Sequence, residues 1–423
     1  MMPVQDRRLW NQLEAWSANA THYRRALLGI FIVALALRAI VAIAHPFYLP
    51  DSVDYSALAK AIVGGRAYEV HGMLAQRLPG YPIFIAAFYY VFGFHHLPVL
   101  LAQAGLGALT VVFTAMLGRC VSPVVGLLAG ALAAIDPLGI GFAASLLSEP
   151  LFTCVFILSL ILLRRLMENP SPPWLWICFA VLWAIAVYVR AEVSLCLFPL
   201  LAWAVYVAPK GIQRRKSIKG SMVTLLVVLV CLMPWWMRNY GLFHQDFFRF
   251  STLQGISLYE AVYSGATGGP RQSDLVIPPS IRHLNESQRD LAWTHLAFME
   301  MIHHPWRIIR LAFVKIARTW SPWLHAKGYA NPAINVVLTL WYVPMFILAI
   351  MGLWRYPIRT PLFGILLVPI VYSTCMHAVF IGSVRYRVPV MPLVVILAAI
   401  GVAQWAARRS AASTTVPPRG GGT

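Results

Sequence analysis

The chain has 423 residues, of which 59% are hydrophobic and only 12% are charged, and its formal net charge is +19. This composition is typical of a polytopic helical membrane protein and excludes a water-soluble globular domain. The Lys and Arg residues are scattered in short segments between apolar runs. That distribution is the ordinary topology signal of membrane proteins, and it argues against a basic nucleic-acid-binding face.

Ten apolar runs are candidates for membrane-spanning helices. They are residues 26–44, 97–117, 121–142, 150–163, 174–189, 193–207, 222–236, 334–353, 362–380 and 388–406. A polar start without a small-residue cleavage site precedes the first run, so we expect this run to be retained. The sequence therefore predicts an all-α polytopic membrane protein with a bundle of about ten transmembrane helices.

The segment 80–93, GYPIFIAAFYYVFG, is the one ambiguous apolar run. Its fourteen residues are few for a span and suit a helix that lies along the membrane or dips into it. If it crossed, there would be eleven spans, and the basic run 210–219, KGIQRRKSIK, would lie outside. Because cytoplasmic loops hold the Lys and Arg excess, we predict that it does not cross and that both termini are cytoplasmic.

This topology divides the chain into four parts. Residues 1–237 form an N-terminal transmembrane module with a first outer loop at 45–96, and residues 238–333 form a long helical outer segment. Residues 334–409 hold the C-terminal transmembrane helices, and we expect the tail 410–423 to be disordered. In the outer segment, apolar residues recur at helical spacing from Ser287 to Trp320, which predicts an amphipathic helix pair on the membrane face.

Several short motifs occur in a defined order along this topology. They are Asp51 followed four residues later by Tyr55, then YSALAKAIVGGRAY, RLPGYPIFIAAFYYVFG, LLSEPLF around Glu149, MPWWMRNYGLF, HHPWRIIRLAFVKIARTW and RYRVPVMP. In this order the chain resembles the GT-C integral-membrane glycosyltransferases, which use polyprenyl-phosphate sugars. It is most similar to the group of protein O-mannosyltransferases and lipid A aminoarabinose transferases. The chain lacks the Asp-Glu pair of the mannosyltransferases, because Ser52 follows Asp51, and it lacks the KPP form of the aminoarabinose enzymes.

The resemblance implies an inverting glycosyltransferase with a GT-C-type bundle. It would move a sugar from a polyprenyl-phosphate donor to a hydroxyl of a cell-envelope glycan, lipid or protein acceptor. Together with the short loops, the resemblance implies a bacterial inner membrane, with the active site facing the periplasm or exterior; the alternative is the endoplasmic reticulum.

Two acids at the start of the first outer loop are candidates for chemistry. In the resembling enzymes the first-loop Asp is the catalytic base, and Asp51 matches it. Partial desolvation beside the membrane predicts a raised pKa for Asp51, which would make it a better base. The alternative is a structural N-cap for a helix beginning near Ser52. Asp54 shares a helix face with Asp51 and is either a substrate-binding residue, like Tyr55, or a first-turn acid favoured by the helix dipole.

Glu149 is the second catalytic candidate, at the outer start of a span. The resemblance implies that it orients the acceptor or a cation, and the alternative is a helix N-terminal acid before Pro150. For Asp136, before Pro137, the pattern favours a residue that ends a helix.

Binding the donor phosphate requires cations. Arg385 and Arg387 lie at the outer end of the last span, where they either grip phosphate or extend to the interface by snorkelling. Arg190 is a similar candidate, with Glu192 as a possible ion-pair partner. Arg38, inside the first span, needs a structural partner or serves the donor site.

Arg77 is the remaining cation in the first outer loop, in RLPGYP, and the resemblance implies a positively charged substrate-binding residue there. No His or Cys pair has metal-ligand spacing, so we expect no cofactor, with a divalent cation near Asp51 and Glu149 as the alternative. The alternative function is a lipid-linked sugar flippase or transporter, which requires polar residues at the bilayer midplane.

Overall fold

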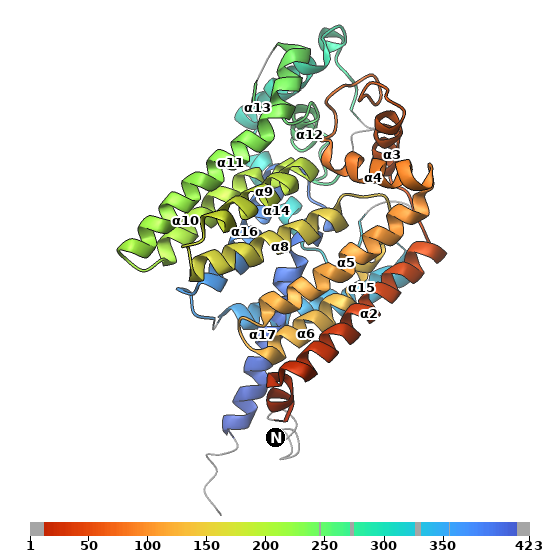
Figure 1. Ribbon diagram of the computed structural model, residues 1–423. Helices are drawn as coiled ribbons and strands as arrows, with labels where there is room; N and C mark the ends of the chain where they lie inside the picture. The colour runs from red at the N-terminus through yellow and green to blue at the C-terminus, as the bar shows by residue number, and fades with distance from the viewer. Residues whose placement is uncertain (1–11, 245–246, 271–274, 326–330, 355, 413–423) are drawn as a thin grey trace, which may run out of the picture.

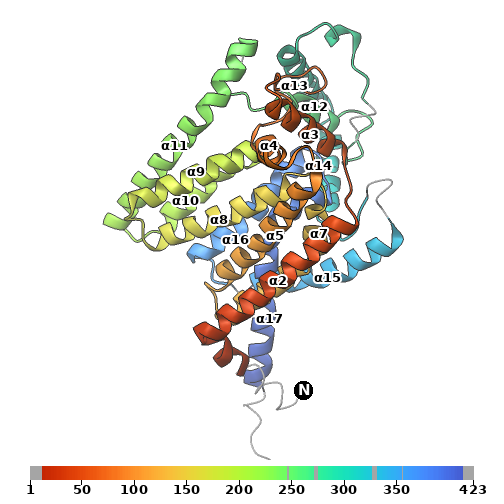
Figure 2. The same ribbon diagram turned by 45° about the vertical axis from the view of Figure 1, so that its right-hand side comes forward.

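Apolar helices make up the body of the molecule (Figures 1 and 2). The computed structural model describes residues 12–244, 247–270, 275–325, 331–354 and 356–412. Its elements are α2 (Ala20–Ala44), α3 (Pro50–Val63), α4 (Gly80–Phe92), α5 (His96–Gly118), α6 (Pro123–Ala134), α7 (Pro137–Ala143), α8 (Glu149–Glu168), α9 (Pro173–Val189), η1 (Ala191–Cys196), α10 (Leu197–Val207), α11 (Ile212–Phe243), α12 (Gln254–Glu260), η3 (Pro279–Ile281), α13 (Glu286–His303), α14 (Pro305–Thr319), α15 (Pro332–Trp354), α16 (Pro361–Val379), η4 (Val384–Val390) and α17 (Met391–Ala412). The all-helical polytopic class predicted from the sequence is confirmed.

Seven helical segments in the described part of the chain are long and apolar enough to cross a membrane. They are α2, α5, α8, α11, α15, α16 and the segment Val384–Ala406. The pair α6 and α7 passes the same test together, and α9 and η1–α10 are shorter apolar helices. Each predicted span coincides with one of these elements, and the total of ten stays a prediction. The 13 residues of α4 extend about 20 Å, against about 30 Å for a bilayer core.

The predicted span 121–142 is two helices, α6 and α7, bent by 53°. Pro137 is the cause, because a proline disfavours helical geometry at the residue before it. Asp136 therefore has extended backbone, and its side chain caps α7 by accepting a hydrogen bond from the N–H of Gly139 at 2.9 Å. The sequence predicts that Asp136 ends a helix. It does lie at a helix boundary, but as the N-cap of α7, whereas α6 ends at Ala134.

Two other boundaries differ from the prediction. The helix expected at 222–236 is 32 residues long, and most of the basic run 210–219 belongs to its first turns. Near the C-terminus, α17 includes residues 410–412, which the prediction placed in a disordered tail. The rest of that tail, 413–423, lies outside the described residues.

The outer segment contains the predicted helix pair. It consists of α13 and α14, which are separated at His304 because Pro305 occupies the first position of α14. A proline there loses no helical hydrogen bond. The start of α2 and the end of α17 lie at the opposite end of the bundle from this pair (Figures 1 and 2).

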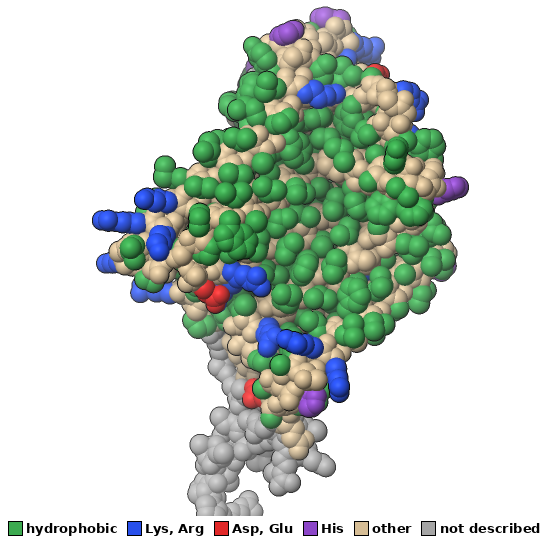
Figure 3. All heavy atoms as spheres, viewed as in Figure 1, with side chains coloured by type: hydrophobic (Ala, Val, Ile, Leu, Met, Phe, Trp, Pro, Cys, Tyr) green, Lys and Arg blue, Asp and Glu red, His purple; other side chains and the backbone are tan. Residues whose placement is uncertain are grey.

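The face shown in Figure 3 is broadly apolar over α2, α5, α8 and α11. Lys and Arg side chains lie at its margins, on the left where α10 and α11 meet, along the lower edge and near the top. An apolar belt with cations at its margins is the expected surface of a bundle surrounded by lipid.

Glycine residues bring α15 and α17 into backbone contact. A methyl group on Gly352 would lie 2.0 Å from the carbonyl oxygen of Leu397, and one on Gly401 would lie 2.1 Å from that of Leu348. Both distances are far below van der Waals contact. Small residues at such crossings allow membrane helices to approach closely.

We expect Gly401→Ala to lower the thermal unfolding temperature, because the added methyl group forces α15 and α17 apart. Overpacking of this kind destabilises by about 1–3 kcal/mol. Gly29→Ala in α2 is the matched control, since its added methyl group has no described atom within 4 Å apart from its chain neighbours and the backbone of its own helix. Both variants are measured by thermal unfolding in the same detergent, and equal midpoints would contradict the close crossing.

Candidate active site

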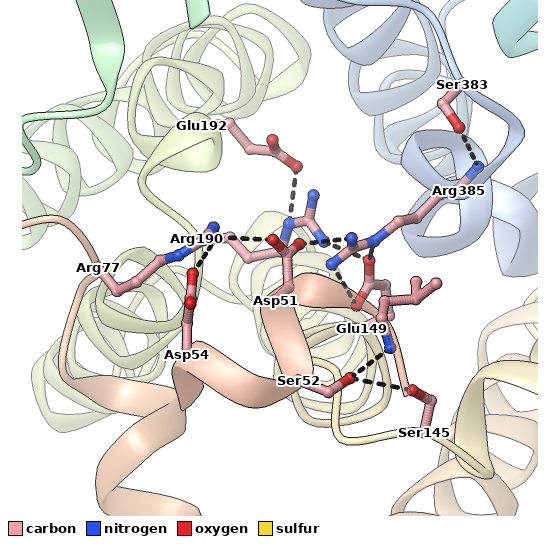
Figure 4. A network of polar contacts seen from close by, with 11 residues as sticks. Asp51, Ser52, Asp54, Arg77, Ser145, Glu149, Arg190, Glu192, Ser383 and Arg385 are labelled. Carbon is pink, nitrogen blue, oxygen red and sulfur yellow. Dashed lines mark hydrogen bonds and ion pairs between the residues drawn. The ribbon is translucent and has the colours of Figure 1, made fainter. Parts of the chain in front are cut away.

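A cluster of charged side chains joins four segments that lie far apart in the sequence (Figure 4). Asp51 comes from the first turn of α3, Glu149 from the first residue of α8, Arg190 from the end of α9, and Arg385 from η4. We call these residues, together with Asp54, Arg77 and Glu192, the charged cluster. Four carboxylates and three guanidinium groups therefore meet at one end of the bundle.

Asp51 lies at the centre of the charged cluster. Its Oδ1 accepts a hydrogen bond from Nη2 of Arg77 at 2.6 Å, and its Oδ2 accepts one from Nη1 of Arg385 at 2.6 Å. The helix begins at Pro50 with Leu49 as the N-cap. The alternative that Asp51 caps a helix starting near Ser52 is therefore wrong, because Pro50 starts the helix one residue before Asp51.

Glu149 is fully buried and forms ion pairs with two arginine side chains. Its carboxylate accepts hydrogen bonds from Nε and Nη2 of Arg385, the latter at 3.4 Å, and lies 2.9 Å from Nη1 of Arg190. Arg190 also donates from Nε to Glu192 at 2.9 Å, so the predicted pair of these two residues is confirmed. Glu149 is both the first-turn acid of α8 and a member of the charged cluster.

The second carboxylate of α3 extends the charged cluster outward. Nη2 of Arg77 donates to Asp54 Oδ2 at 2.8 Å as well as to Asp51, which confirms that the two acids share one helix face. The other oxygen of Asp54 lies 2.9 Å from Nε2 of His71, an exposed side chain. The ring of Tyr55 packs beneath Arg77, 5.4 Å from the guanidinium carbon.

The electrostatics of Asp51 differ from the prediction. Burial alone would raise the pKa of Asp51, but the charges and hydrogen bonds of Arg385 and Arg77 outweigh it and lower the pKa from 3.8 to about 2. The prediction of a raised pKa is therefore wrong. Desolvation raises the pKa of Asp51 as expected. The sequence does not reveal that two guanidinium groups face the same carboxylate.

Two predicted arginines lie outside the charged cluster. Nη1 of Arg387 donates to the carbonyl oxygens of Thr319, at 3.0 Å, and Ser321. Arg38 donates to the carbonyls of Ala133 and Ala134, at 3.0 and 2.9 Å, where α6 ends. The structure therefore supplies backbone partners for both residues and does not bring them to the other candidates.

Tyr386 is a member of this region that the sequence analysis does not single out. Its ring faces the guanidinium group of Arg190 at 5.8 Å and stacks on His377 at 4.4 Å between ring centres. The only feature of the sequence that could have pointed to Tyr386 is its place between Arg385 and Arg387.

In the described residues, no group of three or more His, Cys, Asp or Glu side chains is arranged to hold a metal ion.

Comparisons with known proteins identify the fold. Residues 76–237 match the family model described as dolichyl-phosphate-mannose-protein mannosyltransferase. The structure of the archaeal oligosaccharyltransferase AglB from Archaeoglobus fulgidus, in complex with an inhibitory peptide and a dolichol-phosphate, is similar at 13% sequence identity and a TM-score of 0.57, over 94% of this chain and 52% of that one. A structure of the oligosaccharyltransferase from the same organism, tethered with an acceptor peptide, has a TM-score of 0.59 at 13% identity, over 92% and 50% of the two chains.

ArnT from Cupriavidus metallidurans bound to undecaprenyl phosphate is similar at 15% identity over 94% of this chain and 80% of that one, with a TM-score of 0.40. No curated protein matches the chain. The chain spans about half the length of the archaeal enzymes. Its fold is that of the GT-C membrane glycosyltransferases, as the sequence predicts. The family match includes Arg77, Glu149 and Arg190, whereas Asp51 and Arg385 lie outside it.

We expect Asp51→Asn to lower the thermal stability of the protein at neutral pH by about 2 kcal/mol, the equivalent of the lowered pKa of Asp51. The folded-state pKa, about 2, lies below the ordinary aspartate pKa of 3.8. The ionised carboxylate therefore stabilises the protein fully above about pH 4, and this contribution is lost as the pH falls towards 2.

The measurement is thermal unfolding of wild type and variant in detergent from pH 7 to pH 3. The difference between their midpoints should be constant above pH 5 and should shrink below pH 4. A difference that grows as the pH falls would contradict the ion pairs of Asp51.

Proposed function

We propose that the protein is an inverting glycosyltransferase that moves a hexose or pentose from a polyprenyl-phosphate donor to a hydroxyl of a cell-envelope glycan, lipid or protein. The reaction takes place on the outer face of a bacterial inner membrane. One observation carries this proposal: Arg385 lies between Asp51 and Glu149, with Arg77 and Arg190 beside it, at the end of an apolar helix bundle.

The three arginines of the charged cluster bind the phosphate of the donor. Planar guanidinium groups match phosphate oxygens and donate to them in pairs. Nε of Arg77 is buried and has no hydrogen-bond partner among the described residues, and Nη2 of Arg385 makes only a long contact, 3.4 Å, with Glu149. These N–H groups are therefore available to the negative charge that develops on the departing phosphate.

Asp51 takes the proton of the acceptor hydroxyl. As the hydroxyl oxygen attacks the anomeric carbon, the bond from that carbon to the phosphate oxygen breaks, and its electron pair leaves with the polyprenyl phosphate. A single displacement inverts the anomeric centre. Phosphate is a good leaving group, so the reaction does not need the second, protonating carboxyl of a glycosidase.

The low pKa of Asp51 makes the order of binding part of the mechanism. A carboxylate with a pKa of about 2 is a weak base. A donor phosphate shares Arg385 and Arg77 with Asp51 and adds negative charge beside it, and both effects raise the pKa of Asp51. The carboxylate therefore becomes an effective base only once the donor is bound.

The class of donor is supported by the comparisons and by the placement of the charged cluster. The matching family model is described by dolichyl-phosphate-mannose, and the AglB structure contains a dolichol-phosphate. Both lipids carry a phosphate at the end of a long isoprenoid chain. Arginines at the end of an apolar bundle suit such a molecule, because its phosphate lies at the membrane surface while its chain stays in the lipid.

We expect Asp51→Asn to lower transfer at least about 100-fold, because a general base contributes about 10²–10⁴ in rate. The test is mass spectrometry of cell-envelope glycans from cells lacking the gene, complemented with wild type or variant. One sugar should disappear without the gene, return with wild type and stay absent with the variant.

Asp290→Asn is the matched control, because it makes the same chemical change in another buried Asp–Arg pair, with Arg249 at 2.7 Å. It should restore the sugar in proportion to the protein present in the membrane. Full restoration by Asp51→Asn would remove the base from the mechanism. Glycans unchanged by loss of the gene would remove the proposed function.

A further inference from the structure

The loop that precedes Arg77 is held by the outer segment through one carboxylate. Glu286, the first residue of α13, accepts hydrogen bonds from the backbone N–H groups of Leu74 at 2.6 Å and Ala75 at 3.0 Å. The hydroxyl of Thr252 donates to the same carboxylate. Hydrogen bonds to an ionised acceptor are about twice as strong as neutral ones, so this contact anchors the loop.

Further contacts fix the same stretch of backbone. The N–H of Thr252 donates to the carbonyl oxygen of Ala75 at 3.0 Å, and the hydroxyl of Ser251 donates to that of Gln76 at 2.6 Å. Nη2 of Arg238, in α11, donates to the carbonyl oxygen of Leu74 at 3.0 Å. Backbone groups of residues 74–76 are thus paired with the outer segment and α11 rather than with their own loop.

Arg77 follows this anchored stretch directly. Its Nη2 lies between Asp51 and Asp54, at 2.6 and 2.8 Å, and such a shared contact tolerates little displacement. Binding geometry of this kind is sensitive to shifts of about 1 Å, even when they originate far from the reacting atoms. The position of the Arg77 backbone therefore determines whether its guanidinium reaches the charged cluster.

We infer that Glu286 is a positioning residue for Arg77. By holding the backbone of Leu74 and Ala75, Glu286 places the guanidinium group of Arg77 where it binds the donor phosphate. This inference rests on the proposed function, because it assigns Arg77 to the phosphate. It makes the outer segment part of the donor site, although Glu286 itself belongs to a different helix from any residue of the charged cluster.

The test is a double-mutant cycle on the binding of undecaprenyl phosphate to the purified full-length protein in detergent. Glu286→Gln puts an amide N–H₂ group beside the backbone N–H groups and should weaken binding about tenfold, the effect of losing a hydrogen bond to a charged group. Arg77→Gln should weaken binding by itself. In the Arg77→Gln background, Glu286→Gln should have no further effect, because its influence passes through Arg77.

Glu300→Gln is the matched control, because it makes the same chemical change in the same helix at a carboxylate that is paired with Arg307 instead of the loop. It lies about 21 Å along α13 from Glu286 and should leave binding unchanged. If Glu286→Gln fails to fold, Thr252→Val replaces it in the cycle, since it removes one hydrogen bond to Glu286 and keeps the charge. A smaller loss in the same direction, again absent in the Arg77→Gln background, is then expected.

The outcomes separate the two proposals. Wild-type protein that does not bind undecaprenyl phosphate would remove the proposed function. Two results would overturn the positioning role of Glu286 and leave the proposed function intact. One is that Glu286→Gln binds undecaprenyl phosphate as tightly as wild type, and the other is that the losses of affinity of the two single variants add in the double variant.

Discussion

Arg385 forms ion pairs with two carboxylates from the first half of the chain, and the charged end of the bundle depends on these pairs. Asp51 and Glu149 lie 334 and 236 residues from Arg385 in the sequence, so the guanidinium group connects the first outer loop, the start of α8 and the last span. The side chains of Arg385 and Glu149 are only 17% and 0% exposed, so little water reaches this pair. At the fully buried Glu149, removing one partner of the ion pair leaves an uncompensated charge, which destabilises by about 3–5 kcal/mol.

The arginines of the bundle fall into two groups according to their acceptors. Arg38 and Arg387 donate to backbone carbonyl oxygens, which stay in place whatever binds nearby. Arg77, Arg190 and Arg385 face carboxylates, whose charge a phosphate can replace. The first group satisfies buried charge inside an apolar bundle, whereas the second group is suited to exchange partners with an anionic ligand.

The outer segment contacts the charged cluster indirectly, through the loop before Arg77. Ser251, Thr252 and Glu286 hold the loop before Arg77. Arg77 in turn contacts the two acids of α3. A shift of the outer segment would therefore move Arg77 relative to Asp51 and Asp54.

The sequence by itself determined the class of the protein and pointed to most members of the charged cluster. Apolar runs near twenty residues predict spans because the bilayer offers no partners for backbone polar groups, and scarce acids such as Asp51 and Glu149 stand out in such a chain. What only the tertiary structure decided was which charges meet. Hydropathy and spacing carry no information on contacts across hundreds of residues, so the sequence could not separate Arg385 from Arg387. The raised pKa predicted for Asp51 failed for the same reason: burial can be inferred from local sequence, but the two guanidinium groups that reverse its effect are brought there by the fold.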